Sequence, residues 1–204
     1  QQEAENMAVD MAEMYRVFIE DMLAIPVIVG EKTAVERFAG ADTTLTLEAM
    51  MQDGKAIQTC TSHFLGQNFS KSCDIDFQDK DGQMQHVWMT SWGITTRMIG
   101  GLIMSHADDD GLRLPPRIAP CQCVVIPICP KPELMEGLDP FLAQCETVLR
   151  DCNAFEKPLN WQVDRSEMRA VDKKWHWMKK GVPIRLEIGQ READQGMVSL
   201  TNRC

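Results

Sequence analysis

The sequence predicts an α+β antiparallel sheet with flanking helices, followed by a small α/β domain. Three observations lead to this prediction. Apolar side chains, many of them methionine, recur at three- and four-residue spacing over residues 3–24, which is typical of one face of a helix. Residues 43–50 alternate between apolar and polar side chains, as an antiparallel strand with one buried face does. Beyond residue 116, strand patterns alternate with helix patterns, which is typical of an α/β domain.

The antiparallel part begins with the helix over residues 3–24, which Pro26 ends. Asp53-Gly54 is a hairpin turn signal that follows the strand at 43–50. Further elements are expected in this order: a short strand at 27–29, a returning strand at 56–62, a short helix at 65–72, a long strand at 84–93 and a helix at 96–106. We expect the last helix to be largely buried, because Gly100-Gly101 weakens a helix and usually marks close packing.

A stiff extended segment, Leu114-Pro115-Pro116-Arg117, predicts the boundary between the two domains. We therefore expect the first domain at 1–116 and the second at 117–204. The second domain is expected to contain, in order, a strand at 122–128, a helix at 139–152, a strand at 159–163, a helix at 167–180 and a strand at 184–188.

Charge is divided unevenly along the chain. Of the net charge of −9 over 204 residues, residues 1–149 carry −12 and residues 150–204 carry +3. An acidic surface repels phosphate backbones, so the first part is not expected to bind nucleic acid irrespective of sequence, whereas the mildly basic remainder leaves RNA contact open. No apolar run approaches the ~18–20 residues that span a bilayer, so we expect a non-membrane polypeptide. Because Gln rather than Met stands first, we expect the sequence to be a piece of a longer polypeptide.

The cysteines and the acidic cluster offer possible metal ligands. The eight cysteines lack the paired C-x-x-C spacing of a structural zinc site, and we expect free thiols in a reducing cytosol rather than disulfides or a metal. They are Cys60, Cys73, Cys121, Cys123, Cys129, Cys145, Cys152 and Cys204. Asp108-Asp109-Asp110 is interpreted as a solvated acidic turn, and the histidines at 86, 106 and 176 as structural, since none has a partner at ligand spacing.

A run of polar residues interrupts the apolar sheet. It consists of Gln58, Thr59, Thr61, Ser62 and His63. Burying so many hydrogen-bonding groups costs free energy unless they satisfy one another or a ligand. Strict alternation does not direct Gln58 and Thr61 to the same face, so a joint site requires a bulge or a chain that turns off the strand. A partly exposed polar strand without a ligand is the alternative.

A second polar cluster, residues 91–97, lies where the long strand gives way to a helix. Gly93 permits close approach to the backbone. Arg97 would place a planar cation near the free N–H groups that begin a helix, an arrangement that suits a nucleotide base or phosphate. A surface ion pair is the alternative role for Arg97.

Taken in order, four segments resemble the prolyl-tRNA synthetases of the archaeal/eukaryotic-like type. They are EKTAVERFAGADTTLTLEAM (31–50), IQTCTSHFLGQNFSKSCDIDF (57–77), SWGITTRMIGGLIMSHADDDGLRLPPRIAP (91–120) and KGVPIRLEIG (180–189). The resemblance covers nearly the whole chain and implies part of a class II catalytic core followed by an anticodon-binding domain. It also implies that L-proline is activated by ATP, supplied with Mg²⁺, and then transferred to tRNA(Pro). The enzyme is expected to be a cytoplasmic homodimer, which dimerises mostly through regions outside this segment.

The resemblance carries over to individual positions of this chain. Phe38, His63, Trp92 and Gly93 match positions of the proline pocket, and Phe38 and Trp92 suit an apolar slot for the ring. Gln58, Thr61, Thr95 and Arg97 match positions near ATP, with Arg97 as the catalytic third-motif arginine. No metal site is implied within the segment. Cys60 stands where relatives carry a small residue, so we expect it either to crowd the pocket or to repack beside it.

The resemblance also implies motifs that this sequence does not contain. The family places its first two motifs upstream of residue 1 and a zinc-like domain downstream of residue 204. Two hypotheses follow: a segment of an active proline–tRNA ligase, or a truncated, non-catalytic relative that binds a nucleotide, a tRNA or a partner synthetase. A basic surface for RNA is expected from five residues, namely Lys173, Lys174, Lys179, Lys180 and Arg185.

Overall fold

The computed structural model describes residues 1–129 and 135–203, and the chain divides into two compact units, Gln1–Ser105 and His106–Cys204. Each unit is described by itself. Among the described residues, no helix combines the length and the apolar character that crossing a lipid bilayer requires.

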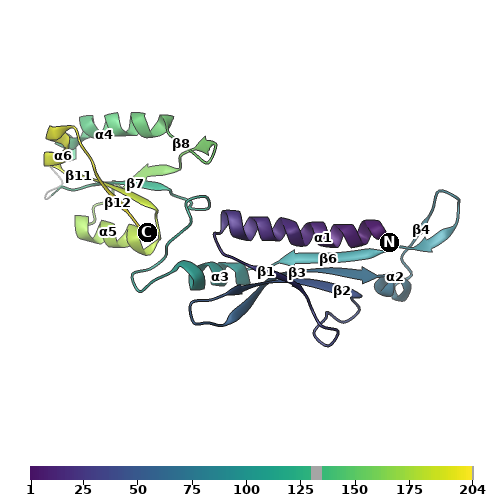
Figure 1. Ribbon diagram of the computed structural model, residues 1–204. Coiled ribbons are helices and arrows are strands. Elements are labelled where there is room, and N and C mark those ends of the chain that lie inside the picture. The colour runs from purple at the N-terminus through teal and green to yellow at the C-terminus, as the bar shows by residue number, and fades with distance from the viewer. Residues whose placement is uncertain (130–134, 204) are drawn as a thin grey trace. The chain divides into compact units, whose positions relative to one another are not determined.

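The first unit is an antiparallel sheet with a helix along one face (Figure 1). Its strand order is β1-β2-β3-β6, with every neighbouring pair antiparallel. The bounds are Ile28–Glu31 for β1, Thr43–Met50 for β2, Ala56–Gly66 for β3 and Met89–Ile94 for β6. The predicted strand at 43–50 is confirmed, and the predicted return strand continues further along the chain than expected, to Gly66.

The core of this unit lies between the sheet and α1 (Gln2–Val17). Small and apolar side chains of α1 are buried, as are Leu47 and Phe64 of the sheet. The hydroxyl of Ser62 donates to the carbonyl of Ala8 at 2.7 Å, which ties β3 to the helix. The predicted helix over 3–24 is confirmed, but its last turn widens to a π-helix at Phe18–Met22, and it ends there because Ala24 adopts a φ of 54°.

Two expectations about the later elements of this unit are wrong. The predicted strand at 84–93 is divided into β5 (Met84–His86) and β6, because β5 leaves the main sheet to pair with β4 (Asp76–Gln78). The helix predicted at 96–106 forms as α3 (Arg97–His106), but it is not largely buried, since Ile99 is 61% exposed and a Cβ on Gly100 would meet nothing within 4 Å. The short helix α2 (Asn68–Ser72) begins later than expected.

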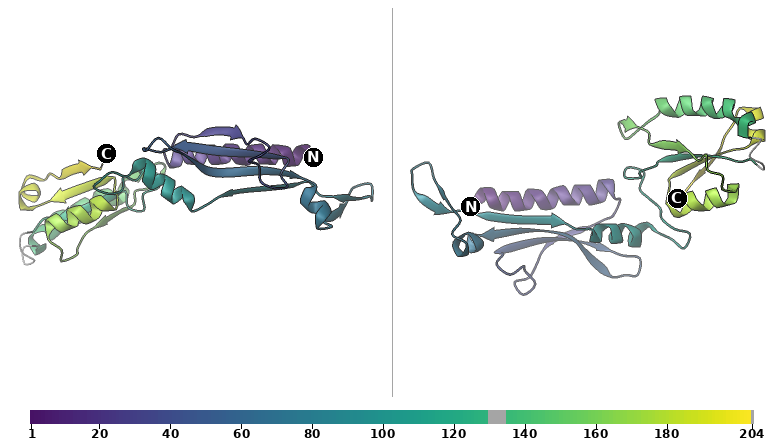
Figure 2. Two further views of the ribbon diagram at one scale, coloured as in Figure 1. Left: turned by 90° about the horizontal axis from the view of Figure 1, so that it is seen from below. Right: turned by 180° about the vertical axis from the view of Figure 1, so that it is seen from behind.

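The second unit is an α/β layer in which helices cover both faces of a four-stranded sheet (Figure 2). The strand order is β10-β7-β11-β12, with β12 antiparallel and the others parallel. The strands are β7 (Cys123–Pro127), β10 (Trp161–Val163), β11 (Ile184–Ile188) and β12 (Ser199–Asn202). The covering helices are α4 (Met135–Asp151) and α5 (Ala170–Lys179), and a two-stranded hairpin follows α4 with β8 (Asn153–Ala154) and β9 (Lys157–Pro158).

Central strand β7 is buried on both faces, as expected for a parallel sheet between helices. Cys123 and Val125 pack with the apolar face of α4, whereas Val124 and Ile126 pack with Trp177 of α5. The alternation predicted from the sequence is therefore confirmed. The short α6 (Gln190–Gln195) and β12 were not predicted, because neither is long enough to show a periodic apolar pattern.

The proline-containing segment before β7 packs on the second unit. Leu112 N–H donates to the carbonyl of Lys179, and Leu114 N–H donates to that of Gly181. The guanidinium of Arg203 pairs with the carboxylate of Asp108. The units consequently divide between Ser105 and His106, earlier in the chain than the boundary predicted at 116/117.

Gly111 is the tightest point of this packing. Its φ is +130°, and a Cβ there would lie 2.6 Å from the Cα of Lys179. Because both the backbone conformation and the contact exclude a side chain, Gly111→Ala should destabilise the second unit by about 2 kcal/mol or more. Urea unfolding measures this. Gly137→Ala, within α4 and without a contact closer than 3.7 Å, is the control and should be neutral or slightly stabilising. Equal stability of the two variants would contradict the prediction.

Candidate active site

The face of the first sheet opposite α1 carries the polar side chains predicted from the sequence. Thr61 lies opposite Thr46 of β2, and His63 lies opposite Thr44. Directly opposed residues of an antiparallel pair point to the same side. These four side chains therefore share one face, while Ser62, between them, points to α1.

A bulge at Thr59 brings Gln58 to the same face. Cys60 pairs with Leu47 and Gln58 pairs with Glu48, so Thr59 is the extra residue, and its hydroxyl donates to the carbonyl of Leu47 at 2.8 Å. Glu48 points to the same side as Thr46, so Gln58 points to the same side as Thr61. The bulge that a joint site requires is therefore present.

Phe38 and His63 lie together at one end of this face. Their ring centroids are 5.2 Å apart, and Phe38 stacks on Phe69 at 6.2 Å. Thr44 Oγ1 and His63 Nδ1 form a hydrogen bond of 2.9 Å. The structure thus combines an aromatic wall with an imidazole of fixed orientation, which suits a small, partly apolar ligand.

The imidazole of His63 is kept from taking up a proton. Its burial lowers its pKa below the ordinary 6.5, and the positive charge of Lys32 lowers the pKa further. His63 is consequently neutral at neutral pH. A neutral ring offers one donor and one acceptor nitrogen, and adds no positive charge to the site.

Gln58 is held by two cationic side chains. Lys32 Nζ donates to the side-chain oxygen Oε1 of Gln58 at 2.5 Å, and Arg97 Nη1 donates to the main-chain carbonyl oxygen of Gln58 at 3.4 Å. Arg97 is the first residue of α3, and its N–H donates to Thr95 Oγ1 at 3.3 Å. Three of the residues predicted to lie near ATP are therefore within hydrogen-bonding reach of one another or of a shared neighbour.

Trp92 is not brought together with Phe38 and His63. It lies directly opposite Ser62 in the register, and Ser62 points to α1. Its side chain therefore lies on the α1 side of the sheet, so it does not form the apolar slot with Phe38. Gly93 lies opposite Thr61, on the polar face.

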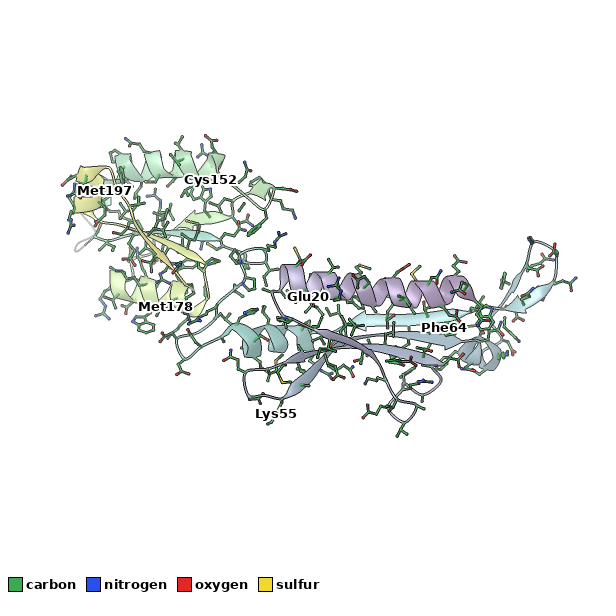
Figure 3. All side chains as sticks on the ribbon, viewed as in Figure 1. Glu20, Lys55, Phe64, Cys152, Met178 and Met197 are labelled. Carbon is green, nitrogen blue, oxygen red and sulfur yellow. The ribbon has the colours of Figure 1, made fainter. Side chains whose placement is uncertain are left out.

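Cys60 likewise lies on the α1 side. It is 3% exposed, and burial raises the pKa of its thiol. Its effect on the candidate site is therefore one of packing beneath the sheet. The seven described cysteines are free thiols, among them Cys152 near the end of α4 (Figure 3).

Sequence reasoning missed the contributions of Lys32, Thr44 and Thr46. Lys32 follows a short strand and precedes a loop without periodicity, so no pattern marks it. Thr46 Oγ1 is buried without a hydrogen-bond partner among the described residues. Lys32, Thr46 and Glu48 line a pocket of about 440 Å³ beside β1 and β2.

The remaining charged clusters have structural partners. Hydrogen bonds from Arg203 hold the pKa of Asp108 far below its ordinary range, so the acidic turn is an ion-paired anchor rather than simply solvated. Among the described residues, no three histidine, cysteine or acidic side chains gather to hold a metal. The predicted basic surface is wrong in part, because Lys173 is 4% and Arg185 is 7% exposed.

Comparison with known proteins assigns both units to families. The family model described as tRNA synthetase class II core domain (G, H, P, S and T) matches residues 1–106, and the model described as anticodon binding domain matches residues 122–204. This chain belongs to the class II tRNA synthetases.

Relatives of this class II synthetase chain include two proline–tRNA ligases. Those of Protochlamydia amoebophila and Akkermansia muciniphila are both 52% identical to it, over 202 and 205 residues. The alignments cover 99% of this chain but only 40% of each relative's length. Prolyl-tRNA synthetase from Cryptosporidium parvum, solved with L-proline and AMP, is 38% identical with a TM-score of 0.89, and the match covers 99% of this chain and 43% of that one.

Removing the charge of Lys32 should raise the pKa of His63, because a positive charge beside the ring disfavours its protonated form. NMR titration of the His63 imidazole in Lys32→Met measures this. Burial remains in the variant, so the pKa should stay below 6.5. Lys55→Met, in the exposed turn between β2 and β3 (Figure 3), is the matched control and should leave the titration unchanged. An unchanged or lowered pKa in Lys32→Met would contradict this account of the site.

Proposed function

We propose that the protein containing this chain activates L-proline with ATP to prolyl-adenylate and transfers the prolyl group to tRNA(Pro). The observation that carries the proposal is the bulge at Thr59, which sets Gln58 on the same face as Thr61 and His63. The solved relative named as binding L-proline and AMP supports these two ligands as occupants of that face.

In the proposed first step, a carboxylate oxygen of proline attacks the α-phosphorus of ATP. The oxygen–phosphorus bond forms as the bond to pyrophosphate breaks, and ATP enters as its Mg²⁺ complex. Negative charge develops on the phosphate oxygens, where the guanidinium of Arg97 and the amide of Gln58 act by electrostatic stabilisation and alignment. A hydroxyl of the terminal ribose of tRNA(Pro) then attacks the prolyl carbonyl and AMP leaves.

The apolar slot for the proline ring is assigned to Phe38 with His63 beside it. Phe38 stacks on Phe69, which supports its ring from within the chain. A slot of this kind separates amino acids that differ by a methylene by only ~1–3 kcal/mol. We therefore expect some misactivation of other small amino acids.

The second unit is proposed to contact the anticodon of tRNA(Pro). Its match to an anticodon-binding family supports this role. The family resemblance further supports a homodimer in the cytoplasm. The buried positions of Lys173 and Arg185 leave Lys174, Lys179 and Lys180 as candidates for RNA contact, with Lys174 already paired to Glu187.

Proline-dependent ATP–pyrophosphate exchange by the full-length gene product tests the proposed function. Arg97→Ala should reduce the exchange rate by about 10²–10³-fold, because a cation aimed at developing charge is removed. Lys55→Met should leave the rate unchanged. Exchange absent from the full-length wild-type protein would instead favour the non-catalytic relative that binds a nucleotide, a tRNA or a partner synthetase.

Substitutions of Phe38 and Trp92, the two residues predicted to form the apolar slot, should have different effects, because Trp92 lies on the α1 side of the sheet and Phe38 lies beside His63. Phe38→Ala should raise KM for proline by about tenfold or more, because apolar contact with the ring is lost. Trp92→Ala should lower thermal stability and change KM for proline by less than about twofold, since its side chain lies on the α1 side. Steady-state exchange kinetics and thermal unfolding measure both. An equal rise of KM in the two variants would argue against the assignment of faces.

A further inference from the structure

Lys32 lies at the junction of the two parts of the proposed site. Its backbone N–H donates to the carbonyl of Thr44 at 2.9 Å, which fixes it beside β2 just after β1 ends. Its side chain reaches the polar face and donates to Gln58 Oε1. In the part of the chain that the structure describes, its ammonium forms no ion pair with a carboxylate.

This contact determines which way the carboxamide of Gln58 faces. A lysine ammonium has only donors, so the carboxamide atom beside it must be the side-chain oxygen Oε1 and not the nitrogen Nε2. The two amide hydrogens of Gln58 therefore point away from Lys32. A carboxamide held in this way offers donors to a ligand and has its own acceptor already satisfied.

The cations around Gln58 indicate the chemistry of that ligand. Lys32 contacts the side chain of Gln58 and Arg97 contacts its main-chain oxygen, so two positive groups adjoin the residue that presents the N–H donors. Donors and cations at one residue match anionic oxygens, with which hydrogen bonds are stronger than with neutral ones. Of the proposed substrates, ATP brings the higher negative charge.

We propose that Lys32 is a positioning residue of the nucleotide site, which holds the Gln58 carboxamide with its N–H groups toward the phosphate oxygens of ATP. This inference rests on the proposed function. It goes further in naming the residue that orients Gln58 and the substrate that depends on it. Because His63 bonds to Thr44 rather than to Lys32, binding of proline should depend on Lys32 much less.

Steady-state ATP–pyrophosphate exchange by the full-length protein tests the proposal through the two KM values. Lys32→Met should raise KM for ATP by about tenfold or more, because the amide is released and a charge is lost. KM for proline should change by less than about twofold. Lys32→Arg, which keeps a donor-only cation, should recover most of the affinity for ATP.

A double-mutant cycle with Gln58→Met shows whether Lys32 acts through Gln58. The two substitutions together should raise KM for ATP by much less than the product of their separate effects. Lys55→Met removes the same kind of side chain from an exposed turn and should leave both KM values unchanged. Thermal unfolding checks each variant, and Lys32→Gln replaces Lys32→Met if the latter does not fold.

Three results would overturn the inference in an active wild-type protein. They are an unchanged KM for ATP in the Lys32 variant, an equal rise in both KM values, and multiplicative effects in the cycle with Gln58. A wild-type protein without exchange activity would overturn the proposed function itself, and is distinguishable from these because it is seen before any substitution is made.

Discussion

One extra residue in β3 determines which side chains of the first sheet can act together. Without the bulge at Thr59, strict alternation would place Gln58 on the α1 side, away from Thr61 and His63 on the polar face. With it, the hydroxyl of Thr59 satisfies the carbonyl of Leu47, and the pairing resumes one residue out of step. The bulge therefore costs the sheet little in unsatisfied hydrogen bonds, and the polar face depends on it.

The register also explains how much of the site the sequence could reveal. The strand at 43–50 and the polar run after it follow from local patterns, because alternation and turn chemistry are local properties. The face on which Trp92 lies depends instead on the pairing of β6 with β3, since Ser62 opposes it. No property of residues 89–94 alone records that pairing, so a motif match placed Trp92 in a slot that its side chain does not enter.

Burial proved similarly difficult to predict for charged and apolar residues alike. Lys173 resembles a surface residue in sequence, yet its ammonium donates to the carbonyl of Asp164 inside the second unit. Ile99 of α3 resembles a core residue, yet it is largely exposed within the first unit. The burial of each of these side chains depends on which other elements of the fold pack beside it. The order of strands and helices, by contrast, was predicted, because each element of sufficient length carries its own period.

Net charge gives no measure of the potential at the proposed site. Residues 1–149 carry −12 overall, which argues against binding an anion. The polar face nevertheless brings both Lys32 and Arg97 into hydrogen-bonding contact with Gln58, with Glu48 opposite it, and keeps His63 neutral. Because Coulomb interactions at contact distance outweigh screened charges further than about 10 Å away, the charges that adjoin Gln58 affect the local field more than the net charge of the chain does. An acidic chain is therefore compatible with a triphosphate substrate, provided that its few cations stand where the phosphates bind.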